Sequence, residues 1–285
     1  MQTTIPEPAL DYCRSELRRH DRERYLTTLF APAEQRPALL ALYAFNLEIA
    51  RTRETVSEPM LGQIRLQWWR EALGEVYAGT PRRHQVVELM AVTLPQSGIS
   101  EESLLRLVDA RARDLDPAPF ATMQELNDYV EGTAAGPLLL ALDILGVPAG
   151  DSARQAAVDA GLAYGLAGLL RAVPYHAARS RLFLPQDLLH AAGLRADQIR
   201  PERAAPGLAD VVRPLATQAE QRVAQARTRP DPAPAAVPAL LVTSIAEHHL
   251  RRLRRCAYDP YALPAGDGGI GLTVKLCIRA WRGRF

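Results

Sequence analysis

The sequence of 285 residues predicts an all-α fold, with about ten helices in one domain that spans residues 1–285. Apolar residues recur at helical spacing in almost every patterned segment of the chain. No segment alternates apolar and polar residues for long enough to predict a strand, and no Asn-Gly hairpin turn is present. Capping residues, glycines and prolines mark where the helices should begin and end.

The first predicted helices occupy residues 39–50 and 57–79. In the first, Leu39, Tyr43, Leu47 and Ala50 recur at helical spacing. In the second, Ser57 is the expected cap, because a serine before an apolar stretch accepts a hydrogen bond from the first turn. A proline in the first turn is tolerated there, and Gly79 is the expected end of the helix.

Three further helices are predicted before residue 147. One begins after Thr80-Pro81, and one begins at Ser100, where two glutamates follow in the first turn. Thr122 and Glu125 form a capping-box pattern that opens a third helix, which runs toward residue 146. Pro137 should kink that helix, since proline removes a main-chain donor and crowds the preceding turn.

The second half of the chain is also predicted to be helical. Asp151 should start a long helix that ends before Pro174, and Pro185 should open a short one. Long helices are expected at 208–227 and 238–256, joined by a stiff proline-rich segment at 228–238, and a final helix at 271–281.

Three glycines lie on one face of the predicted helix that starts at Asp151. Gly161, Gly165 and Gly168 are spaced four and three residues apart, and each costs up to about 1 kcal/mol relative to alanine. The pattern has two interpretations of equal weight. The glycines allow close approach of a neighbouring helix, or they line a smooth cavity.

Composition and charge exclude several classes of protein. The net charge is +2, with 34 basic residues interspersed among 32 acidic ones, so no basic face for nucleic acid is expected. The densest basic segment, 248–255, should face water at the end of a helix. Three isolated cysteines predict neither a disulfide framework nor a metal site. They fit a reducing compartment.

The chain carries no pattern of an export or import signal, because its first residues have no basic and apolar run. Its longest uncharged apolar stretch, 132–142, is far shorter than the roughly 20 residues that span a bilayer. We therefore expect a cytoplasmic protein that lies, at most, on a membrane surface.

Four segments resemble the squalene and phytoene synthase family of helical prenyl transferases. They are Leu-Tyr-Ala-Phe at 42–45, Asp-Leu-Asp at 114–116 ahead of the stretch 129–136, the helix 161–173, and the segment 181–188. The resemblance extends along nearly the whole chain. It implies a helical bundle of the isoprenoid synthase type around a central apolar cavity.

The chemistry of that family requires Mg²⁺, held by carboxylates in two motifs of aspartates spaced four residues apart. This spacing places both carboxylates on one helix face, and Mg²⁺ prefers such hard oxygen ligands. In this sequence the first motif falls on Ala50, Arg51 and Glu54, and the second falls on Ala172 and His176. We therefore expect no metal, no cofactor and no catalytic residue, and a protein that is not a metal-dependent enzyme.

Acidic pairs four residues apart do occur elsewhere, as Glu54 with Glu58 and Glu71 with Glu75. We expect them to lie on solvated helix faces, because no opposing pair accompanies them.

The substitutions match a narrower, catalytically degenerate subgroup of the family, the assembly factor 6 proteins of mitochondrial respiratory complex I. The resemblance is carried by the segments 44–50, 56–58, 65–69, 170–176, 181–185 and 278–282. It implies a non-catalytic assembly factor whose partners are complex I subunits or assembly intermediates. Without an import presequence, it also implies a bacterial relative in which complex I lies in the plasma membrane.

Two groups of side chains are candidate binding residues. Arginines in or near the degenerate motifs are expected either to hold a phosphate or lipid headgroup directly, or to pair with acids such as Glu48 and Asp187. They are Arg51, Arg53, Arg171, Arg179 and Arg181. Tyr43, Phe45, Tyr164, Tyr175 and His176 are expected either to line an apolar pocket for a lipid or isoprenoid, or to lie in the core.

Two alternatives stay open. The first alternative is that the chain is an active, Mg²⁺-dependent synthase that joins two prenyl diphosphates head to head. This alternative rests on analogy of fold. The basic tail at 275–285, with Trp281 and Phe285, docks on the bundle, contacts a membrane surface peripherally, or does both.

Overall fold

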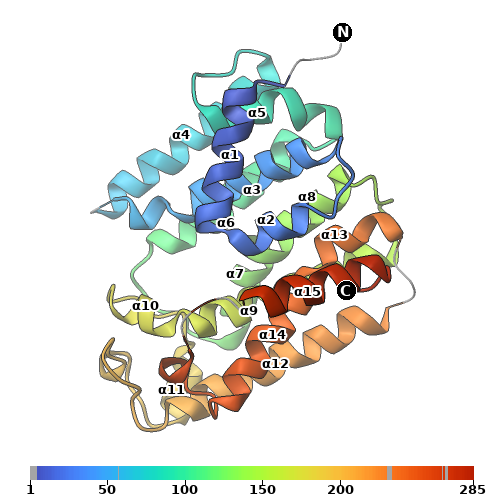
Figure 1. Cartoon of the computed structure of the whole chain (residues 1–285). Helices are drawn as coiled ribbons and strands as arrows, with labels where there is room; N and C mark the ends of the chain where they lie inside the picture. The colour runs from blue at the N-terminus through green and yellow to red at the C-terminus, as the bar shows by residue number, and fades with distance from the viewer. Residues whose placement is uncertain (1–4, 57, 230–232, 265, 267–268) are drawn as a thin grey trace. The chain divides into compact units, whose positions relative to one another are not determined.

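All regular secondary structure of the described residues is helical, apart from an isolated β-bridge between Arg200 and Arg203. The computed structural model describes residues 5–56, 58–229, 233–264, 266 and 269–285. They fall into two units (Figure 1), of which the first comprises Met1–Asp116, Gly136–Arg154 and Asp231–Ala239. The second unit comprises Pro117–Ala135, Gln155–Pro230 and Leu240–Phe285.

Helices of the first unit come from separate stretches of the chain. They are α1 (Glu7–His20), α2 (Arg22–Thr28), α3 (Arg36–Ala50), α4 (Pro59–Ala78), α5 (Gln85–Thr93), α6 (Glu101–Ala112) and α8 (Gly136–Ile144), with 3₁₀ turns at Thr52–Glu54, Pro95–Ser97, Arg113–Leu115 and Pro234–Ala236.

The core of the first unit is built around α3, which packs against α1, α5 and α8. Phe45 and Trp69 meet edge to face there, with ring centroids 5.3 Å apart. Leu39 and Leu42 of α3 are buried beside them. Because α3 is apolar on nearly every side, it forms the centre of this unit rather than its surface.

The second unit contains both long and short helices. They are α7 (Met123–Val130), the π-helical segment η4 (Glu131–Ala135), α9 (Ser152–Arg171), α10 (Val173–Ala177), α11 (Gln186–Ala191), α12 (Leu208–Thr228), α14 (Val242–Arg255) and α15 (Gly269–Trp281), with 3₁₀ turns at Ala196–Gln198 and Pro260–Ala262. The first residues of α9 belong to the first unit, and the short α13 (Val237–Leu240) lies at the boundary of the two.

The core of the second unit combines aromatic side chains with leucines of the long helices. Phe120, Tyr129 and Phe183 contact one another, with ring centroids 5.2 to 6.0 Å apart. Asp159 of α9 is fully buried and is neutralised by Arg222 and Arg229, at 2.9 and 3.2 Å. A buried carboxylate needs such partners, so these ion pairs fix α9 relative to α12 and its C-terminal extension.

Several predicted helix ends are confirmed. Ser100 Oγ accepts a hydrogen bond from the Ser103 amide, and Thr122 Oγ1 accepts one from the Glu125 amide, each at 3.2 Å. Gly79 ends α4 with φ of 78°, a left-handed conformation that glycine adopts without strain. The final helix is also confirmed, as α15.

Other helix boundaries differ from the prediction. The cap of α4 is Glu58, without a side-chain hydrogen bond, while the expected cap Ser57 lies outside the described residues. The helix predicted after Thr80-Pro81 is present as α5, but it begins only at Gln85. The reason is that Arg82 turns back to Glu75, and the His84 ring packs on the tryptophans of α4.

The expected kink at Pro137 takes the form of a π-helical segment. Residues 131–135 are wound into a π-helix between α7 and α8. Proline crowds the carbonyl four residues earlier, here that of Thr133, which lies inside the segment. The wider winding of a π-turn relieves this contact.

Contacts around the glycines of α9 settle part of the open question. A Cβ on Gly161 would lie 2.3 Å from Ala135 Cα, and a Cβ on Gly165 would lie 2.5 Å from Val130 Cγ1. Close approach of α9 to the end of α7 and to η4 therefore explains these two glycines. Gly168 has no atom within 4 Å of such a Cβ and faces open space.

Within the described ranges, none of the helices combines the length and the hydropathy that crossing a bilayer requires.

Candidate functional site

The first degenerate motif lies at the end of α3 and in the 3₁₀ turn that follows it. Ala50 is the last residue of α3, Arg51 is its C-cap, and Glu54 is exposed in the turn. Arg51 Nη1 pairs with Glu16 Oε2 of α1 at 3.3 Å. The first position therefore offers no ligand atom, and the second presents a cation that is bound to a neighbouring acid.

Nearby charges of the first unit are paired in the same way. Glu48 accepts a hydrogen bond from Arg65 Nη2 at 2.8 Å, and Arg53 donates to the main-chain oxygen of Val56 at 3.2 Å. The expected pairing of these arginines with acids is thus confirmed for Arg51, although its partner is Glu16 rather than Glu48.

The acidic pair on α4 has a structural role. Glu71 and Glu75 both bind Arg82, whose guanidinium also stacks over the Trp68 ring at 4.9 Å. The hydrogen bond from Arg82 lowers the pKa of Glu75, and burial opposes this only weakly. The two carboxylates thus hold the connection between α4 and α5 in place. This structural role does not require an opposing acidic pair.

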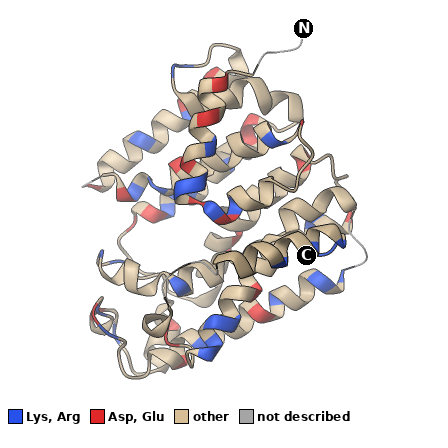
Figure 2. Cartoon of the chain, in the orientation of Figure 1, with Lys and Arg blue, Asp and Glu red and all other residues tan. Residues whose placement is uncertain are grey.

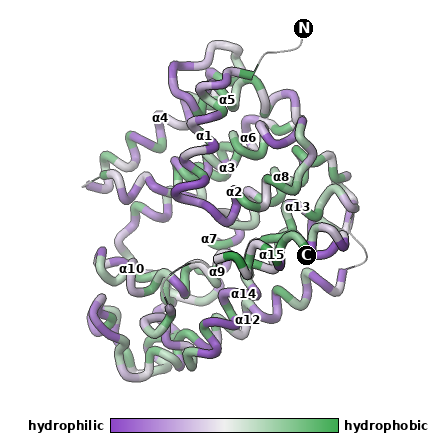
Figure 3. The backbone as a smooth tube through the Cα atoms, viewed as in Figure 1, coloured by the Kyte–Doolittle hydropathy of each residue, from purple (hydrophilic) through white to green (hydrophobic). Residues whose placement is uncertain are grey.

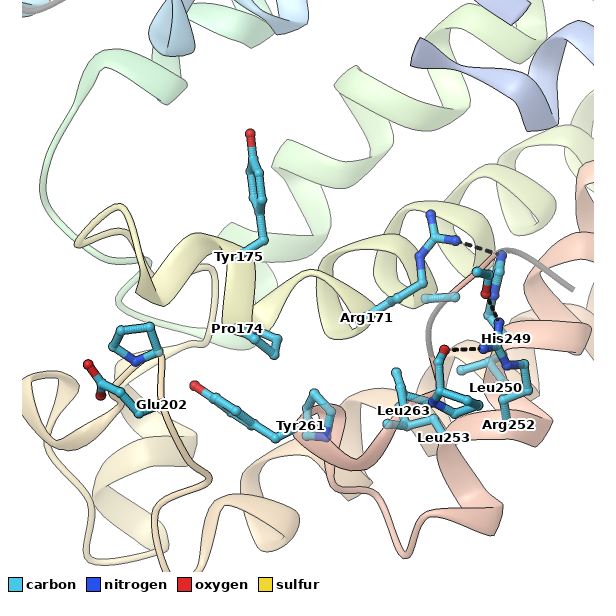
Figure 4. A pocket seen from close by; sticks show the side chains of 15 residues that line it. Arg171, Pro174, Tyr175, Glu202, His249, Leu250, Arg252, Leu253, Tyr261 and Leu263 are labelled. Atoms are coloured by element: carbon cyan, nitrogen blue, oxygen red, sulfur yellow. Dashed lines mark hydrogen bonds between the residues drawn. The ribbon is translucent and has the colours of Figure 1, made fainter. Parts of the chain in front are cut away.

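The second degenerate motif lies where α9 ends and α10 begins. Arg171 is the last residue of α9, Ala172 caps α10, and His176 follows one turn later. Arg171 Nη1 donates to His249 Nε2 of α14 at 3.2 Å, as the dashed line in Figure 4 shows. The His176 ring packs against Phe183 with centroids 4.6 Å apart, so its position is set by aromatic packing.

Two further candidate arginines stack on aromatic rings. The Arg179 guanidinium lies 3.6 Å from the Tyr175 ring centroid, and that of Arg181 lies 4.8 Å from the Phe183 centroid. A cation over a ring face is attracted by the negative potential of that face. Asp187, proposed as an acidic partner, instead accepts hydrogen bonds from the main chain at Met123 and Leu188.

A cavity of about 510 Å³ opens beside the second motif, within the second unit (Figure 4). Arg171 and Tyr175 line it from the α9–α10 side, and His249 and Arg252 line it from α14. The remaining lining residues include Glu202 and Gly266 and are otherwise mostly apolar or aromatic: Ala167, Pro174, Pro201, Leu250, Leu253, Pro260, Tyr261, Leu263 and Pro264. The cavity therefore presents polar and apolar groups side by side, and concave sites that bind small molecules also combine both kinds.

Hydrogen bonds fix the polar wall of this cavity. Arg252 donates to the main-chain oxygens of Gly266 and Pro264, at 2.6 and 2.5 Å. Tyr261 donates to the main-chain oxygen of Arg200 at 2.6 Å. Burial, together with the charges of Asp259 and Glu202, raises the pKa of Tyr261, so its hydroxyl stays protonated and remains a donor.

Sequence reasoning missed His249 and Arg252 as members of this site. Both lie in the basic segment 248–255, which was expected to face water. Arg254 and Arg255 do so, but His249 is only 5% exposed. Helical spacing places His249 on the same face as Leu250 and Leu253, and that apolar face indicated its burial.

The aromatic candidates divide between core and cavity. Tyr43 and Phe45 are core residues of the first unit, where burial raises the pKa of Tyr43. Tyr164 packs against the core of the second unit. Tyr175 lines the cavity, as proposed. The roles of these residues in binding stay predictions.

The donor atoms of the two motifs do not fit Mg²⁺. Ala50 and Ala172 have no ligand atoms, Arg51 is cationic, and His176 is an imidazole packed on a phenyl ring. Mg²⁺ demands oxygen ligands in an octahedral array. Throughout the part of the chain that the structure describes, no group of three or more His, Cys, Asp or Glu side chains is placed to hold a metal ion.

Comparison with known proteins identifies the family. The family model for squalene/phytoene synthase matches residues 17–282, nearly the whole chain. The chain belongs to the squalene/phytoene synthase family. The match covers residues of both units. The assignment of residues 1–285 to one domain stays a prediction.

Among curated members of the squalene/phytoene synthase family, near full-length relatives are named as assembly factors. The mouse protein "NADH dehydrogenase (ubiquinone) complex I, assembly factor 6" is 34% identical over 96% of this chain and 82% of its own length. The human protein of that name is 32% identical over 95% of this chain and 81% of its own. The maize chloroplastic phytoene synthase 3 is 28% identical over only 65% of this chain and 45% of its own.

Solved structures of this family show the fold. Squalene synthase HpnC from Alicyclobacillus acidocaldarius superposes with a TM-score of 0.76, at 23% identity over 89% of this chain and 95% of its own. A dehydrosqualene synthase gives 0.79, at 18% identity over 97% and 96%. The all-helical isoprenoid synthase fold predicted from the sequence is thereby confirmed.

Proposed function

We propose that this protein is a non-catalytic assembly factor for respiratory complex I, the NADH:quinone oxidoreductase, built on a prenyl transferase scaffold. One observation carries the proposal: of the positions onto which the resemblance places the acidic residues of the synthases, namely Ala50, Arg51, Glu54, Ala172 and His176, only Glu54 is acidic, and Arg51 is bound to Glu16. The near full-length likeness to proteins named complex I assembly factor 6 supports it. Its partners are complex I subunits or assembly intermediates.

The cavity beside the second motif gives this scaffold a ligand site of its own. Arg171 and Arg252 supply positive charge, and proline, leucine and tyrosine side chains supply an apolar wall. Arginine binds phosphate without a metal, by charge-assisted hydrogen bonds. We therefore assign the cavity to a lipid or isoprenoid with an anionic head, bound and not turned over.

The location follows from the proposed partner. Complex I is a membrane complex, and none of the described helices of this chain can span a bilayer. We place the protein on the cytoplasmic side, peripheral to the membrane that holds complex I.

Deletion of the gene tests the assembly role. Assembled complex I on native gels and NADH-driven quinone reduction should both fall, and squalene- and phytoene-derived products should stay unchanged. Complementation with the unaltered gene should restore complex I. Normal complex I together with missing isoprenoids would overturn the proposal.

Incubation of the purified protein with Mg²⁺ and farnesyl or geranylgeranyl diphosphate tests the absence of catalysis. We expect no pyrophosphate release above the protein-free background. A squalene synthase assayed in parallel is the positive control. Release at a rate that depends on this protein would establish the alternative, an active synthase.

A further inference from the structure

The last helix, α15, exposes an apolar face. Leu272 and Leu276 are buried against the second unit, whereas on the opposite side the side chains are apolar and accessible. The exposed fractions are 83% for Ile270, 49% for Val274, 45% for Ile278 and 86% for Trp281. We call these four residues the outer face of α15; green along this helix in Figure 3 marks its hydropathy.

The charged residues of α15 turn inward instead. Lys275 Nζ pairs with Glu247 Oε2 at 2.8 Å, and Arg279 Nη1 donates to the main-chain oxygen of Phe285 at 3.4 Å. A surface helix ordinarily turns its charged side to water and its apolar side to the core. The exposed side of α15 instead carries apolar side chains, so a stripe of apolar surface is in contact with solvent.

A cluster of ion pairs holds α15 in this orientation. Glu247 binds Arg227, Arg251 and Lys275, and Arg227 Nε also donates to the main-chain oxygen of Phe285 at 3.0 Å. Phe285 itself is buried. The helix is therefore docked firmly, as one of the sequence alternatives predicted, and its outer face is exposed because α15 is anchored and not because it is frayed.

Basic residues outnumber acidic ones in the last part of the chain, and two of them directly follow the outer face. After Leu240 the sequence has eight arginines and lysines against three acidic residues, although the whole chain carries only +2. Arg282 and Arg284, directly after α15, are exposed, and Arg254 of α14 has 58% of its side chain exposed. Figure 2 shows the blue of basic residues along α12 and α14, while α15 is mostly tan.

A groove of mixed charge adjoins the cluster that anchors α15. It has a volume of about 310 Å³ and lies between α12 and α14. Arg227, Arg251 and Arg254 line it, together with Glu220 and Glu247. These arginines are paired with the two glutamates, so the groove carries only a small excess of positive charge.

We propose that the outer face of α15 binds the surface of a membrane that contains anionic lipids. Apolar side chains with a tryptophan on one side, and basic residues around them, are the pattern of a helix that lies in the plane of the interface. Tryptophan favours the headgroup level of a bilayer, and arginines near the surface attract anionic headgroups. This inference rests on the membrane location proposed above and deepens it, because it names the surface that makes the contact.

Flotation with lipid vesicles tests the proposal on the full chain. The protein should float with vesicles of phosphatidylcholine mixed with phosphatidylglycerol. Binding should be about tenfold weaker with phosphatidylcholine alone, or when salt screens the charges. The triple variant Ile270→Ser/Val274→Ser/Trp281→Ser should lose about tenfold or more of the binding, and it should fold, because the replaced side chains are exposed.

Exposed apolar residues of the first unit provide a matched control. Met60, Leu61 and Ile64 of α4 are 71%, 46% and 61% exposed, so their triple replacement by serine removes a similar amount of apolar surface. This control variant should float as the parent does. Equal flotation of the parent and the α15 variant, or an equal loss in the α4 variant, would overturn the proposal.

A label on Cys277 provides a second readout. This thiol is exposed on α15 between Val274 and Trp281. A polarity-sensitive dye attached there, in a Cys256→Ser background, should shift to shorter wavelength with anionic vesicles and not with neutral ones. A concentration-dependent dimer in light scattering that the α15 variant abolishes would show that a second copy covers the face, and would refute the membrane assignment.

The two proposals fail separately. A finding that the outer face does not bind vesicles would have no bearing on the complex I phenotype of the gene deletion. Conversely, a deletion without effect on complex I would leave the flotation result standing.

Discussion

Replacing Gly161 by alanine tests whether close approach of α9 to η4 sets the geometry of the second unit. The added Cβ would lie 2.3 Å from Ala135 Cα and 2.7 Å from Ala135 N. Both are main-chain atoms, so no change of rotamer relieves the contact and the two segments have to move apart. Overpacking of this kind costs about 1–3 kcal/mol. Because main-chain atoms cannot move aside as a side chain can, we expect the upper end of this range, about 3 kcal/mol.

An opposing effect reduces this cost. Alanine is favoured over glycine in a helix interior by about 1 kcal/mol. The net loss in the free energy of unfolding should therefore be about 2 kcal/mol. For a chain of this length that corresponds to a fall in Tm of about 4 °C.

Gly168→Ala is the matched control, because it lies in the same helix and a Cβ there meets no atom within 4 Å. It should gain the helix preference alone, about 1 kcal/mol, and raise the Tm by about 2 °C. Urea denaturation followed by far-UV circular dichroism measures both variants. If Gly161→Ala is as stable as the parent, or if the two variants shift together, then close approach does not explain Gly161.

Three further predictions concern titratable groups. Burial raises the pKa of Cys13 to about 12, so a thiol-reactive dye at neutral pH should label the exposed Cys277 first, and Cys13 only after unfolding. Burial lowers the pKa of His84 below its ordinary 6.5. Protonation therefore favours the unfolded chain, and the free energy of unfolding should fall as the pH drops below about 6.5. The variant His84→Gln should show a smaller fall in urea titrations. Burial opposes ionisation of Glu247, but hydrogen bonds from Arg227, Lys275 and Arg251 outweigh it and hold the pKa well below its ordinary 4.5. The stability that this carboxylate contributes is then present at neutral pH and lost below about pH 4.5. The variant Glu247→Gln should be less stable at pH 7 and less sensitive to acid in thermal melts. An acid profile like that of the parent would contradict this prediction.

Local sequence determined most helix positions, because the groups that cap a helix act within one turn. Ser100 and Thr122 bond to amides three residues away, and Gly79 adopts the left-handed conformation that ends α4. The chemistry of single motif positions is visible in the same way. Alanine at positions 50 and 172 removes ligand atoms whatever the fold around them.

Tertiary structure decided what local patterns leave open, because these outcomes depend on residues distant in sequence. The delayed start of α5 follows from Arg82 turning back to Glu75, and the partner of Arg51 is Glu16 rather than the nearer Glu48. His249 entered the candidate site only because α14 places it beside Arg171. Gly161 and Gly168 look alike in sequence, yet one meets main chain and the other open space. For α15 the sequence supplied an amphipathic helix, and the ion pairs to Glu247 decided which side faces water.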